Sequence, residues 1–420
     1  MVKAARPRRN RDATAGSASG SEARSILLTS APSLFSPTVR MQSPSEPDLS
    51  FLPDDLENPA YLRDQIITYL GNKRALLPFL GQAVRTVKQR LGKDRLNCVD
   101  LFSGSGIVAR FLKREAAFLA ANDLELYSEI TNRCYLSNKN EIDQDELRHW
   151  QEHILAGIAA DPSPGLITRL YAPRNDDRIE PGERVFYSRR NALFLDAARR
   201  QIARLPKPRQ ALFLAPLLAE ASVRANTAGV FKGFYKNRQG IGQFGGQGRH
   251  ALTRILGAIT LPLPVLSNFS SQVLVTRRDA NDFFPCSELP DLDLCYLDPP
   301  YNQHPYGSNY FMLNLLAEYQ EPTAISPVSG IPENWNRSRY NQSKLAEPTL
   351  LELIHRCPAK FILISYNSEG FIHPRSFSAD LARLGRLEVL ETTYNAFRGC
   401  RNLHNRNLHV QEFLFLLEKS

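Results

Sequence analysis

The stretch LDLCYLDPPY, residues 292–301, joins an apolar run to a polar turn. The run 292–297 predicts a strand that is buried on both faces, and open α/β sheets bind their ligands at the carboxyl ends of such strands. At that end stand the carboxylate of Asp298, the carbonyl of Pro299 and the ring of Tyr301. These three groups suit a planar base with an exocyclic amine, so we predict that they are catalytic. A proline turn that merely ends the strand is the alternative.

A strand–helix–strand–helix order upstream of this stretch predicts the fold class. The strands are expected at 96–102 and 116–122, and each is followed by a helical pattern, at 107–114 and at 124–138. Parallel strands in this order need right-handed crossovers, which implies an α/β fold with a doubly wound sheet. Further strands are expected at 272–275 and 361–366, and a terminal β-hairpin with a long loop is expected from the runs 386–393 and 410–417.

A glycine-rich turn, DLFSGSG at residues 100–106, lies between the first of these strands and its helix. Gly104 and Gly106 allow the backbone to approach a ligand closely, and the helix N-terminus adds donor N–H groups. Ala109 excludes the dinucleotide pattern G-x-G-x-x-G. Asp123 follows Gly104 by nineteen residues, close to the spacing of an acid that accepts ribose hydroxyls. The alternatives are a purely structural turn and a helix N-cap at Asp123.

The segment YLGNKR, residues 69–74, precedes a long helical pattern at 74–91. Gly71 and Asn72 favour a tight turn, and the ammonium group of Lys73 could pair with a carboxylate. A simple helix start would use the same residues, so the segment by itself leaves both interpretations open.

Positive charge is concentrated in one part of the chain. Of 420 residues, 52 are Lys or Arg and 43 are Asp or Glu, which gives a formal net charge of +9. Between 184 and 278 there are sixteen cations and two acids, a net charge of +14, so the remainder is slightly negative. Cations bind phosphates, and this window is expected to contact DNA unless it is only a solvated surface. The expected DNA-binding residues are Arg224, Asn226, Lys232, Lys236 and Arg238, with Arg398 and Arg401 in the hairpin loop.

Cysteines and apolar runs indicate the cell compartment. The six cysteines are single and form no C-x-x-C pair, which disfavours a zinc site and fits a reducing cytosol. No apolar stretch reaches the length of a membrane span, and the first residues lack an apolar signal core. We therefore expect a cytoplasmic protein with no membrane segment.

The three motifs, in this order, resemble those of Dam-type (alpha group) adenine-N6 DNA methyltransferases. YLGNKR is similar to the family's N-terminal cofactor motif, DLFSGSG to its glycine motif and DPPY to its catalytic motif. The resemblance covers about residues 60–418 and is strongest to the modification enzymes of restriction systems. It implies S-adenosylmethionine as cofactor, double-stranded DNA as substrate, no metal, a cognate restriction endonuclease as partner, and a monomer. The implied cofactor-binding residues are Tyr69, Gly71, Lys73, Asp100, Phe102, Gly104, Gly106, Asp123 and Asp298, with Asp282 and Phe283 as a further acid–Phe element.

The resemblance also implies a division of the chain. Residues 51–185 and 276–420 are expected to form the doubly wound S-adenosylmethionine-dependent methyltransferase domain. Residues 186–275 are expected to form an inserted, mostly helical DNA-recognition region. The first fifty residues, 1–50, are rich in Ser, Pro, Ala and Arg and predict a disordered basic tail.

The implied reaction takes place at the DPPY turn. Asp298 and the Pro299 carbonyl would accept hydrogen bonds from the adenine amine, and Tyr301 would stack on the extruded base. Protein glutamine methylation usually goes with Asn in place of Asp298, which disfavours that activity. An RNA adenine methyltransferase and a catalytically inactive DNA-binding protein are the alternatives.

Overall fold

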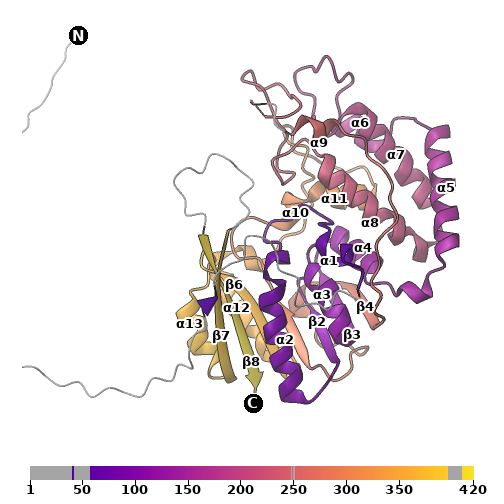
Figure 1. The fold of residues 1–420 in the computed structure, drawn as a ribbon. Coiled ribbons are helices and arrows are strands. Elements are labelled where there is room, and N and C mark those ends of the chain that lie inside the picture. Colours follow the sequence, from indigo (N-terminus) through magenta and orange to yellow (C-terminus); the bar gives the residue numbers. More distant parts are fainter. Residues whose placement is uncertain (1–39, 42–56, 247, 249–250, 396–408) are drawn as a thin grey trace, which may run out of the picture. The chain divides into compact units, whose positions relative to one another are not determined.

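The computed structural model describes residues 40–41, 57–246, 248, 251–395 and 409–420. These residues form an α/β architecture built on one eight-stranded sheet (Figure 1). The strands are β1 (Arg40–Met41), β2 (Leu96–Asp100), β3 (Ala116–Asp123), β4 (Gln272–Arg277), β5 (Leu294–Leu297), β6 (Phe361–Asn367), β7 (Gly385–Asn395) and β8 (His409–Lys419).

The strand order is β1-β7-β8-β6-β5-β2-β3-β4. Neighbouring strands from β4 to β6 are all parallel, whereas β8 runs antiparallel to both β6 and β7. The chain builds outward from β2 through β3 to β4 and then continues on the other side of β2 with β5 and β6. The doubly wound sheet and the terminal hairpin are therefore confirmed. The switch point of this sheet, where such folds bind ligands, lies between β2 and β5.

The helices of the described residues alternate with the parallel strands and also form a separate helical part. The α-helices are α1 (Ala60–Arg63), α2 (Leu77–Leu91), α3 (Ile107–Glu115), α4 (Leu126–Tyr135), α5 (Gln144–Ala160), α6 (Leu166–Tyr171), α7 (Arg189–Ala203), α8 (Lys207–Arg224), α9 (Leu252–Leu256), α10 (Tyr306–Asn309), α11 (Phe311–Glu318), α12 (Ser343–Arg356) and α13 (Pro374–Leu381). The short 3-10 helices are η1 (Arg74–Leu76), η2 (Lys139–Glu141), η3 (Ala280–Asp282) and η4 (Arg339–Asn341).

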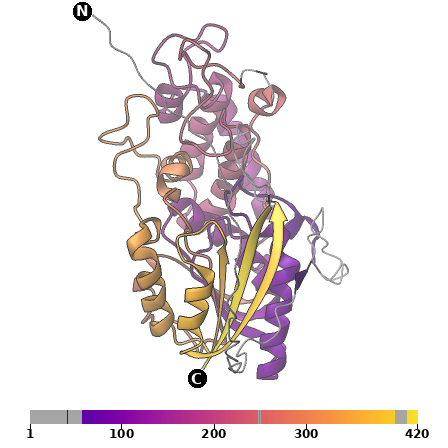
Figure 2. The ribbon, with the colours of Figure 1, turned by 90° about the vertical axis from the view of Figure 1, so that its left-hand side faces the viewer.

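Alternate residues of the central strands face opposite sides of the sheet. On β5, Leu294 and Tyr296 belong to one buried apolar cluster, while Cys295 and Leu297 belong to another. The first cluster includes residues of α2, α3 and α4, and the second includes residues of α12 and α13 (Figure 2). Because helices cover both faces, the strand sequence is continuously apolar rather than alternating.

The helix predicted at 74–91 has two parts. It begins as the 3-10 turn η1 and continues as α2. Gly92 ends it with a left-handed φ of +63°, and its N–H donates to the carbonyl of Gln89. The structure thus places the YLGNKR segment directly before a stable helix that packs on the sheet.

The helical part is formed mainly by α5 to α9 and α11. Helix α8 packs against α4, and both α5 and α6 pack against α7. Apolar residues of this part belong to the same cluster as those on the first face of the sheet. Since α5 precedes residue 186, helices outside the predicted DNA-recognition region contribute to this part, and the limits 186–275 stay a prediction. No helix among the described residues is long and apolar enough to cross a membrane.

Candidate active site

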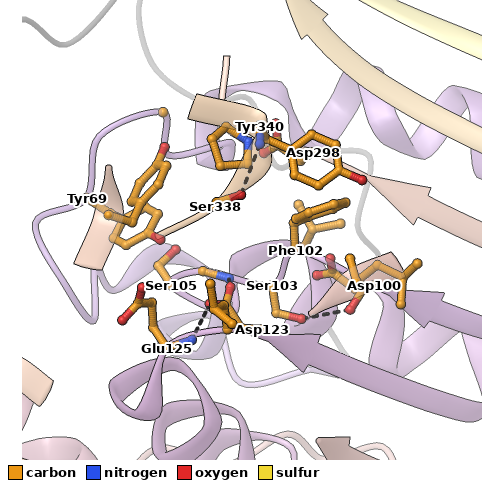
Figure 3. A pocket seen from close by; sticks show the side chains of 18 of the residues that line it. Tyr69, Asp100, Phe102, Ser103, Ser105, Asp123, Glu125, Asp298, Ser338 and Tyr340 are labelled. Carbon is orange, nitrogen blue, oxygen red and sulfur yellow. Dashed lines mark hydrogen bonds between the residues drawn. The ribbon is translucent and has the colours of Figure 1, made fainter. Parts of the chain in front are cut away.

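Three carboxylates lie at the carboxyl ends of three adjacent strands. Asp123 ends β3, Asp100 ends β2, and Asp298 follows β5 directly. Strand β2 pairs with both β3 and β5, which brings the three ends to one edge of the sheet. There the three residues line one cavity of roughly 880 Å³, a volume that includes its open mouth (Figure 3). The cavity thus lies at the switch point of the sheet, the position at which such folds bind ligands.

Asp100 is a buried acceptor at this cavity. The residue is 1% exposed, and neither of its carboxylate oxygens accepts a hydrogen bond from the described residues. Burial, followed by the charges of Asp298 and Asp123, raises the pKa of this carboxyl well above its ordinary value. A buried polar group without a partner is costly, so the geometry suits a ligand that brings its own donor to Asp100.

The glycine-rich turn after β2 depends on the lack of side chains. Gly104 and Gly106 have left-handed φ angles of +52° and +77°. A Cβ on Gly104 would lie 2.8 Å from Cε1 of Tyr69, and a Cβ on Gly106 would lie 2.8 Å from Oδ1 of Asn132. Gly71, with a φ of +72°, also lines the cavity. The turn therefore allows both a close approach of Tyr69 and an open cavity next to the backbone.

Asp123 connects two turns beside the cavity. Its Oδ2 accepts the N–H of Gly104 at 2.7 Å, and its Oδ1 accepts the N–H of Glu125 at 2.9 Å. Helix α4 begins only at Leu126 with Glu125 in the N-cap position, so the alternative of a helix N-cap at Asp123 is wrong. Burial raises the pKa of Asp123. The residue lines the cavity, where the ribose-binding acid is expected.

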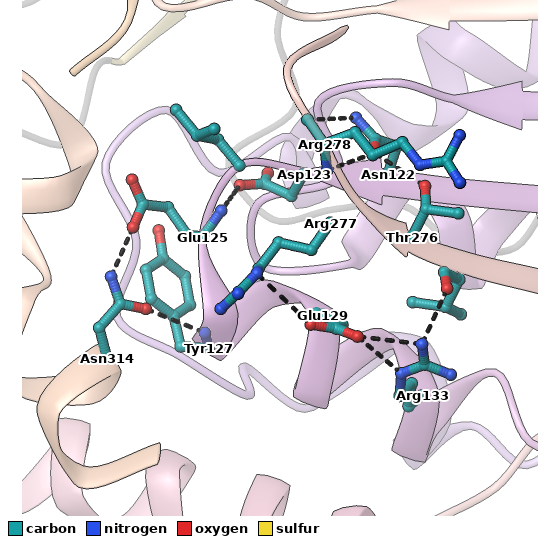
Figure 4. Close-up of polar contacts among 12 residues, drawn as sticks. Asn122, Asp123, Glu125, Tyr127, Glu129, Arg133, Thr276, Arg277, Arg278 and Asn314 are labelled. Atoms are coloured by element: carbon teal, nitrogen blue, oxygen red, sulfur yellow. Dashed lines mark hydrogen bonds and ion pairs between the residues drawn. The ribbon is translucent and has the colours of Figure 1, made fainter. Parts of the chain in front are cut away.

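Glu125 is a cavity residue that the sequence analysis missed. Its Oε2 accepts a hydrogen bond from Nδ2 of Asn314 (Figure 4) and another, at 3.1 Å, from Nδ2 of Asn336. Burial, followed by the charge of Asp123, raises the pKa of Glu125 to about 7. The signal in the sequence was a second acid two residues after Asp123, but a polar helix start explains such a residue equally well.

Aromatic rings form two walls of the cavity. On one side Tyr69 stacks on Tyr310 with 4.8 Å between ring centroids and on Tyr306 with 5.1 Å. On the other side Phe102 meets Tyr340 edge-on at 5.2 Å. Tyr69 and Phe102, both predicted to bind a cofactor, line the cavity.

Lys73 is a buried cation between two carboxylates. Its Nζ lies 2.7 Å from Oε1 of Glu412 and 3.3 Å from Oδ1 of Asp298, and the residue is 2% exposed. The interpretation that Lys73 pairs with a carboxylate is confirmed. The hydroxyl of Tyr301 donates to Asp298 and accepts from Lys73. Burial raises the pKa of Asp298 to about 6, with Lys73 opposing the rise and Glu412 adding to it.

Tyr301 and Pro299 lie beside the cavity and are not part of its lining. The ring of Tyr301 packs edge-on against Tyr366, with 4.9 Å between centroids, and Nζ of Lys73 lies 4.7 Å from its centre. Its hydroxyl is bonded to Asp298. In this conformation the ring predicted to stack on a base therefore packs against protein groups.

The structure does not place Asp282 and Phe283 in the cavity, which corrects the prediction for this segment. Asp282 is exposed, and Phe283 is fully buried in the apolar cluster on the α12 face of the sheet. The acid of this segment that lines the cavity is Asp279, followed by Ala280. Asp279 is the N-cap of the short turn η3, whereas Asp282 is its last residue, so the two acids stand at opposite ends of the turn.

Three of the predicted DNA-binding cations are exposed on one loop. Lys232, Lys236 and Arg238 are all exposed to solvent. An antiparallel bridge between Lys236 and Gly242 shapes the loop, and Nζ of Lys236 lies 5.0 Å from the ring centre of Phe234. Two further predicted cations, Arg398 and Arg401, lie between β7 and β8, outside the described residues.

Asn226 serves the fold and is not available to read a base, which corrects its prediction. It is fully buried. Its Nδ2 donates to the carbonyls of Val185 at 2.7 Å and Gln243 at 2.8 Å, and its Oδ1 accepts the N–H of Gly245 at 2.9 Å. The side chain therefore fixes the glycine-rich segment against the helical part.

Arg224 is half-buried and bonded within the helical part. Its guanidinium donates to the carbonyl of Arg254 at 3.2 Å and pairs with Glu220 at 3.7 Å. The guanidinium of Arg199 is also bonded within the fold, since it donates to the carbonyls of Leu316 and Ala317. Some of the sixteen cations between 184 and 278 therefore stabilise the fold, and fewer than sixteen are available to contact DNA phosphates.

One family and several proteins match this chain. The family described as D12 class N6 adenine-specific DNA methyltransferase matches residues 69–160 and 264–375. The type II methyltransferase M.NlaIII of Neisseria lactamica is 30% identical over 364 residues, which are 84% of this chain and 100% of that protein. The type II methyltransferase M.CviAII of Paramecium bursaria Chlorella virus 1 is 26% identical over 361 residues, 84% of this chain and 98% of that protein. The modification methylase StsI of Streptococcus sanguinis is 25% identical over 379 residues, 84% of this chain and 52% of that protein.

Replacing Asn226 tests its structural role. Asn226→Ala leaves two carbonyls and one N–H without their buried partner, so the free energy of unfolding should fall by on the order of 2–4 kcal/mol. Gln239→Ala, at an exposed side chain of the neighbouring loop, should change it by less than about 0.5 kcal/mol. Denaturant titration measures both. Unchanged stability in Asn226→Ala, combined with loss of DNA binding, would contradict the structural role.

Replacing Gly104 tests the close approach of backbone to Tyr69. Gly104→Ala should weaken binding of the cofactor expected from the sequence, S-adenosylmethionine, about tenfold, if moving the Tyr69 ring costs on the order of 1.4 kcal/mol. Gly92→Ala is the matched control, because Gly92 also has a left-handed φ but a Cβ there would meet nothing within 4 Å. Both variants pay the cost of a left-handed φ, and Gly104→Ala should lose more stability because only its Cβ must displace a ring. Calorimetric titration should show weaker binding only for Gly104→Ala. Equal binding by the two variants would refute this account of the turn.

Proposed function

Because the chain belongs to the D12 class of N6 adenine-specific DNA methyltransferases, we propose that its methyl donor and the target adenine meet in the cavity at the ends of β3, β2 and β5. The protein methylates N6 of adenine at specific sites in DNA. One observation carries the assignment of the cavity: Asp123, Asp100 and Asp298 come together in it from three adjacent strands.

The chemistry of the lining suits S-adenosylmethionine as the methyl donor. Asp100, buried and without a protein donor, suits the ammonium group of the amino-acid part. Asp123 and Glu125 suit the ribose hydroxyls, and the rings of Phe102 and Tyr340 suit the adenine ring. Bound there, the sulfonium would supply an electrophilic methyl group to N6, with a neutral thioether as the leaving group and with N6 releasing a proton afterwards.

Asp298 prepares the adenine amine for this transfer. Its carboxylate and the carbonyl of Pro299 both accept hydrogen bonds from N6, which directs the nitrogen lone pair out of the conjugated ring toward the methyl group. The acceptors are fixed before the base arrives, so little reorganisation is needed during the reaction. Asp298 need not be a strong base, because the amine becomes acidic only after methylation.

Base entry changes the position of Tyr301. The target adenine leaves the duplex and its amine replaces the Tyr301 hydroxyl at Asp298. Once that hydrogen bond is released, the Tyr301 ring is free to turn and stack on the base. The stacking role predicted for Tyr301 thus requires a rotation away from the conformation described above.

We assign DNA recognition to the region between the two parts of the catalytic domain. The family match leaves residues 161–263 between its two segments, and the exposed cations Lys232, Lys236 and Arg238 lie there. We assign the DNA-recognition region to 186–275 and expect contacts with the phosphates from these three residues. Arg398 and Arg401 stay predictions of the same kind.

The biological role follows from the names of the relatives. Several are type II methyltransferases or modification methylases. By analogy with these names, we propose that this chain is the modification enzyme of a restriction system. A cognate restriction endonuclease, a cytoplasmic location and a monomeric state stay predictions from the sequence. Family membership favours DNA over RNA as the substrate, and the intact carboxylates at the cavity favour an active enzyme over an inactive DNA-binding protein.

Replacing Asp298 tests the catalytic assignment. Asp298→Ala removes the principal acceptor for N6 and should lower the rate of methyl transfer to duplex DNA by at least about a hundredfold, while DNA binding persists. Asp282→Ala, at an exposed acid outside the cavity, should keep the wild-type rate. Incorporation of label from radioactive donor and a gel-shift assay measure the two properties. Full methyl transfer by Asp298→Ala would exclude the proposed site.

Replacing Arg238 tests the assignment of the exposed loop. Arg238→Ala should weaken DNA binding and reduce the slope of log K against log salt by about 0.9, the contribution of one phosphate contact. Arg383→Ala is the control, since this exposed cation lies outside 186–275 and pairs with Asp380. A series of binding titrations from low to high salt provides the slopes. Identical slopes for Arg238→Ala and the wild type would remove this loop from the DNA interface.

A further inference from the structure

Glu412 is a buried charge that neither the sequence motifs nor the proposed reaction uses. It is fully buried on β8, opposite Asn367 of β6. Its Oε1 accepts from Nζ of Lys73 at 2.7 Å and from Oγ of Ser365 at 2.5 Å, and the hydroxyl oxygen of Tyr301 lies 3.3 Å away. A carboxylate so far from water is costly unless it is paired, and here it is paired with the cation that also faces Asp298.

Lys73 divides a single positive charge between two acids. Its Nζ is nearer to Glu412, at 2.7 Å, than to Asp298, at 3.3 Å. The shorter contact is the stronger charge-assisted hydrogen bond. Glu412 therefore takes the larger share of the ammonium charge, and Asp298 keeps more of its capacity to accept a hydrogen bond from another donor.

We propose that Glu412 is a positioning residue for methyl transfer, which holds the Lys73 ammonium away from Asp298 so that the adenine amine can bind that carboxylate. Glu412 does not contact the reacting atoms and acts through Lys73. This inference rests on the proposed role of Asp298. It adds a residue of the C-terminal hairpin to the machinery formed by the YLGNKR and DPPY motifs.

Loss of the Glu412 charge has two physical consequences. Lys73 would then turn from Glu412 to Asp298, and the adenine amine would compete with a tighter ammonium–carboxylate pair. The like charge of Glu412, which helps to hold the pKa of Asp298 near 6, would also disappear. Both effects favour the ionised form of Asp298, so its pKa should fall. The titratable and charged groups that act on or face Asp298 are Lys73, Asp100, Tyr296, Tyr301, Tyr306 and Glu412.

The pH dependence of methyl transfer distinguishes this role from a purely structural one. Asp298 is the stronger hydrogen-bond acceptor when ionised, so the wild-type single-turnover rate should fall as the pH drops through about 6. In Glu412→Gln this acid limb should move about one pH unit lower, and the rate on the plateau should fall about tenfold. Glu412→Asp keeps the charge and should keep the acid limb near its wild-type position.

Two further variants complete the design. Glu418→Gln is the matched control, because Glu418 lies on the same strand and pairs with Arg90 at 3.2 Å, away from Asp298; its profile should equal the wild type. The pair Lys73→Met with Glu412→Gln removes the ammonium together with its nearer carboxylate and leaves Asp298 without Lys73, so the acid limb of the pair should lie above that of Glu412→Gln. If Glu412→Gln does not fold, Lys73→Met is compared with the double variant instead. The acid limb of Lys73→Met should lie at a higher pH than that of the double variant, because Lys73→Met keeps the like charge of Glu412.

The outcomes separate this inference from the proposed function. An acid limb that stays at the wild-type pH in Glu412→Gln, or that moves equally in Glu418→Gln, would overturn the role of Glu412. The role of Glu412 would also be overturned if the double variant and the single variant with which it is compared, Glu412→Gln or Lys73→Met, lost activity at the same pH. Retained activity in Asp298→Ala would contradict the proposed function itself. If Asp298→Ala is inactive and the acid limb of Glu412→Gln stays at the wild-type pH, only the role of Glu412 is contradicted.

Discussion

The site depends on one ammonium group buried between two carboxylates. Lys73 precedes α2, Asp298 follows β5, and Glu412 lies on β8, so the three groups come from distant parts of the chain. Each charge is costly in the protein interior and is tolerated only where its partner is in place. The N-terminal motif, the catalytic turn and the C-terminal hairpin must therefore pack together before any of the three charges is stable. This requirement couples completion of the fold to assembly of the site.

A second constraint comes from the parallel sheet. Adjacent parallel strands end at the same edge, and here three of them end in or next to an aspartate. The negative charges of Asp100, Asp123 and Asp298 lie close enough for their neighbours to raise the pKa of Asp100. A cavity lined in this way favours a ligand with positive charge, which relieves the repulsion as it binds. Both the ammonium and the sulfonium of S-adenosylmethionine carry such charge.

The features that could be predicted from the sequence are local. A continuous apolar run, a glycine pair and a polar residue at a strand end identify Asp100, Gly104, Asp123 and Asp298, because the strand itself fixes where they lie. Glu412 could not be found in this way, since its partner Lys73 is 339 residues distant in the chain. Asn226 and Arg224 resembled DNA-binding residues because composition does not tell a buried polar side chain from an exposed one. The acid of the cavity wall was placed at Asp282 and not Asp279, because a short 3-10 turn shifts the register without leaving a pattern.

The central claim is that Asp298 accepts a hydrogen bond from the amine of an extruded adenine beside the methyl donor. The most direct measurement is a structure of the protein with S-adenosylhomocysteine and a duplex that contains its methylation site. The account predicts a flipped adenine whose N6 lies about 2.7–3.2 Å from an Asp298 oxygen, with the thioether sulfur in the cavity lined by Asp100 and Asp123. An adenine that stays stacked in the duplex, or an N6 held by other groups while Asp298 remains bonded to Tyr301, would contradict it.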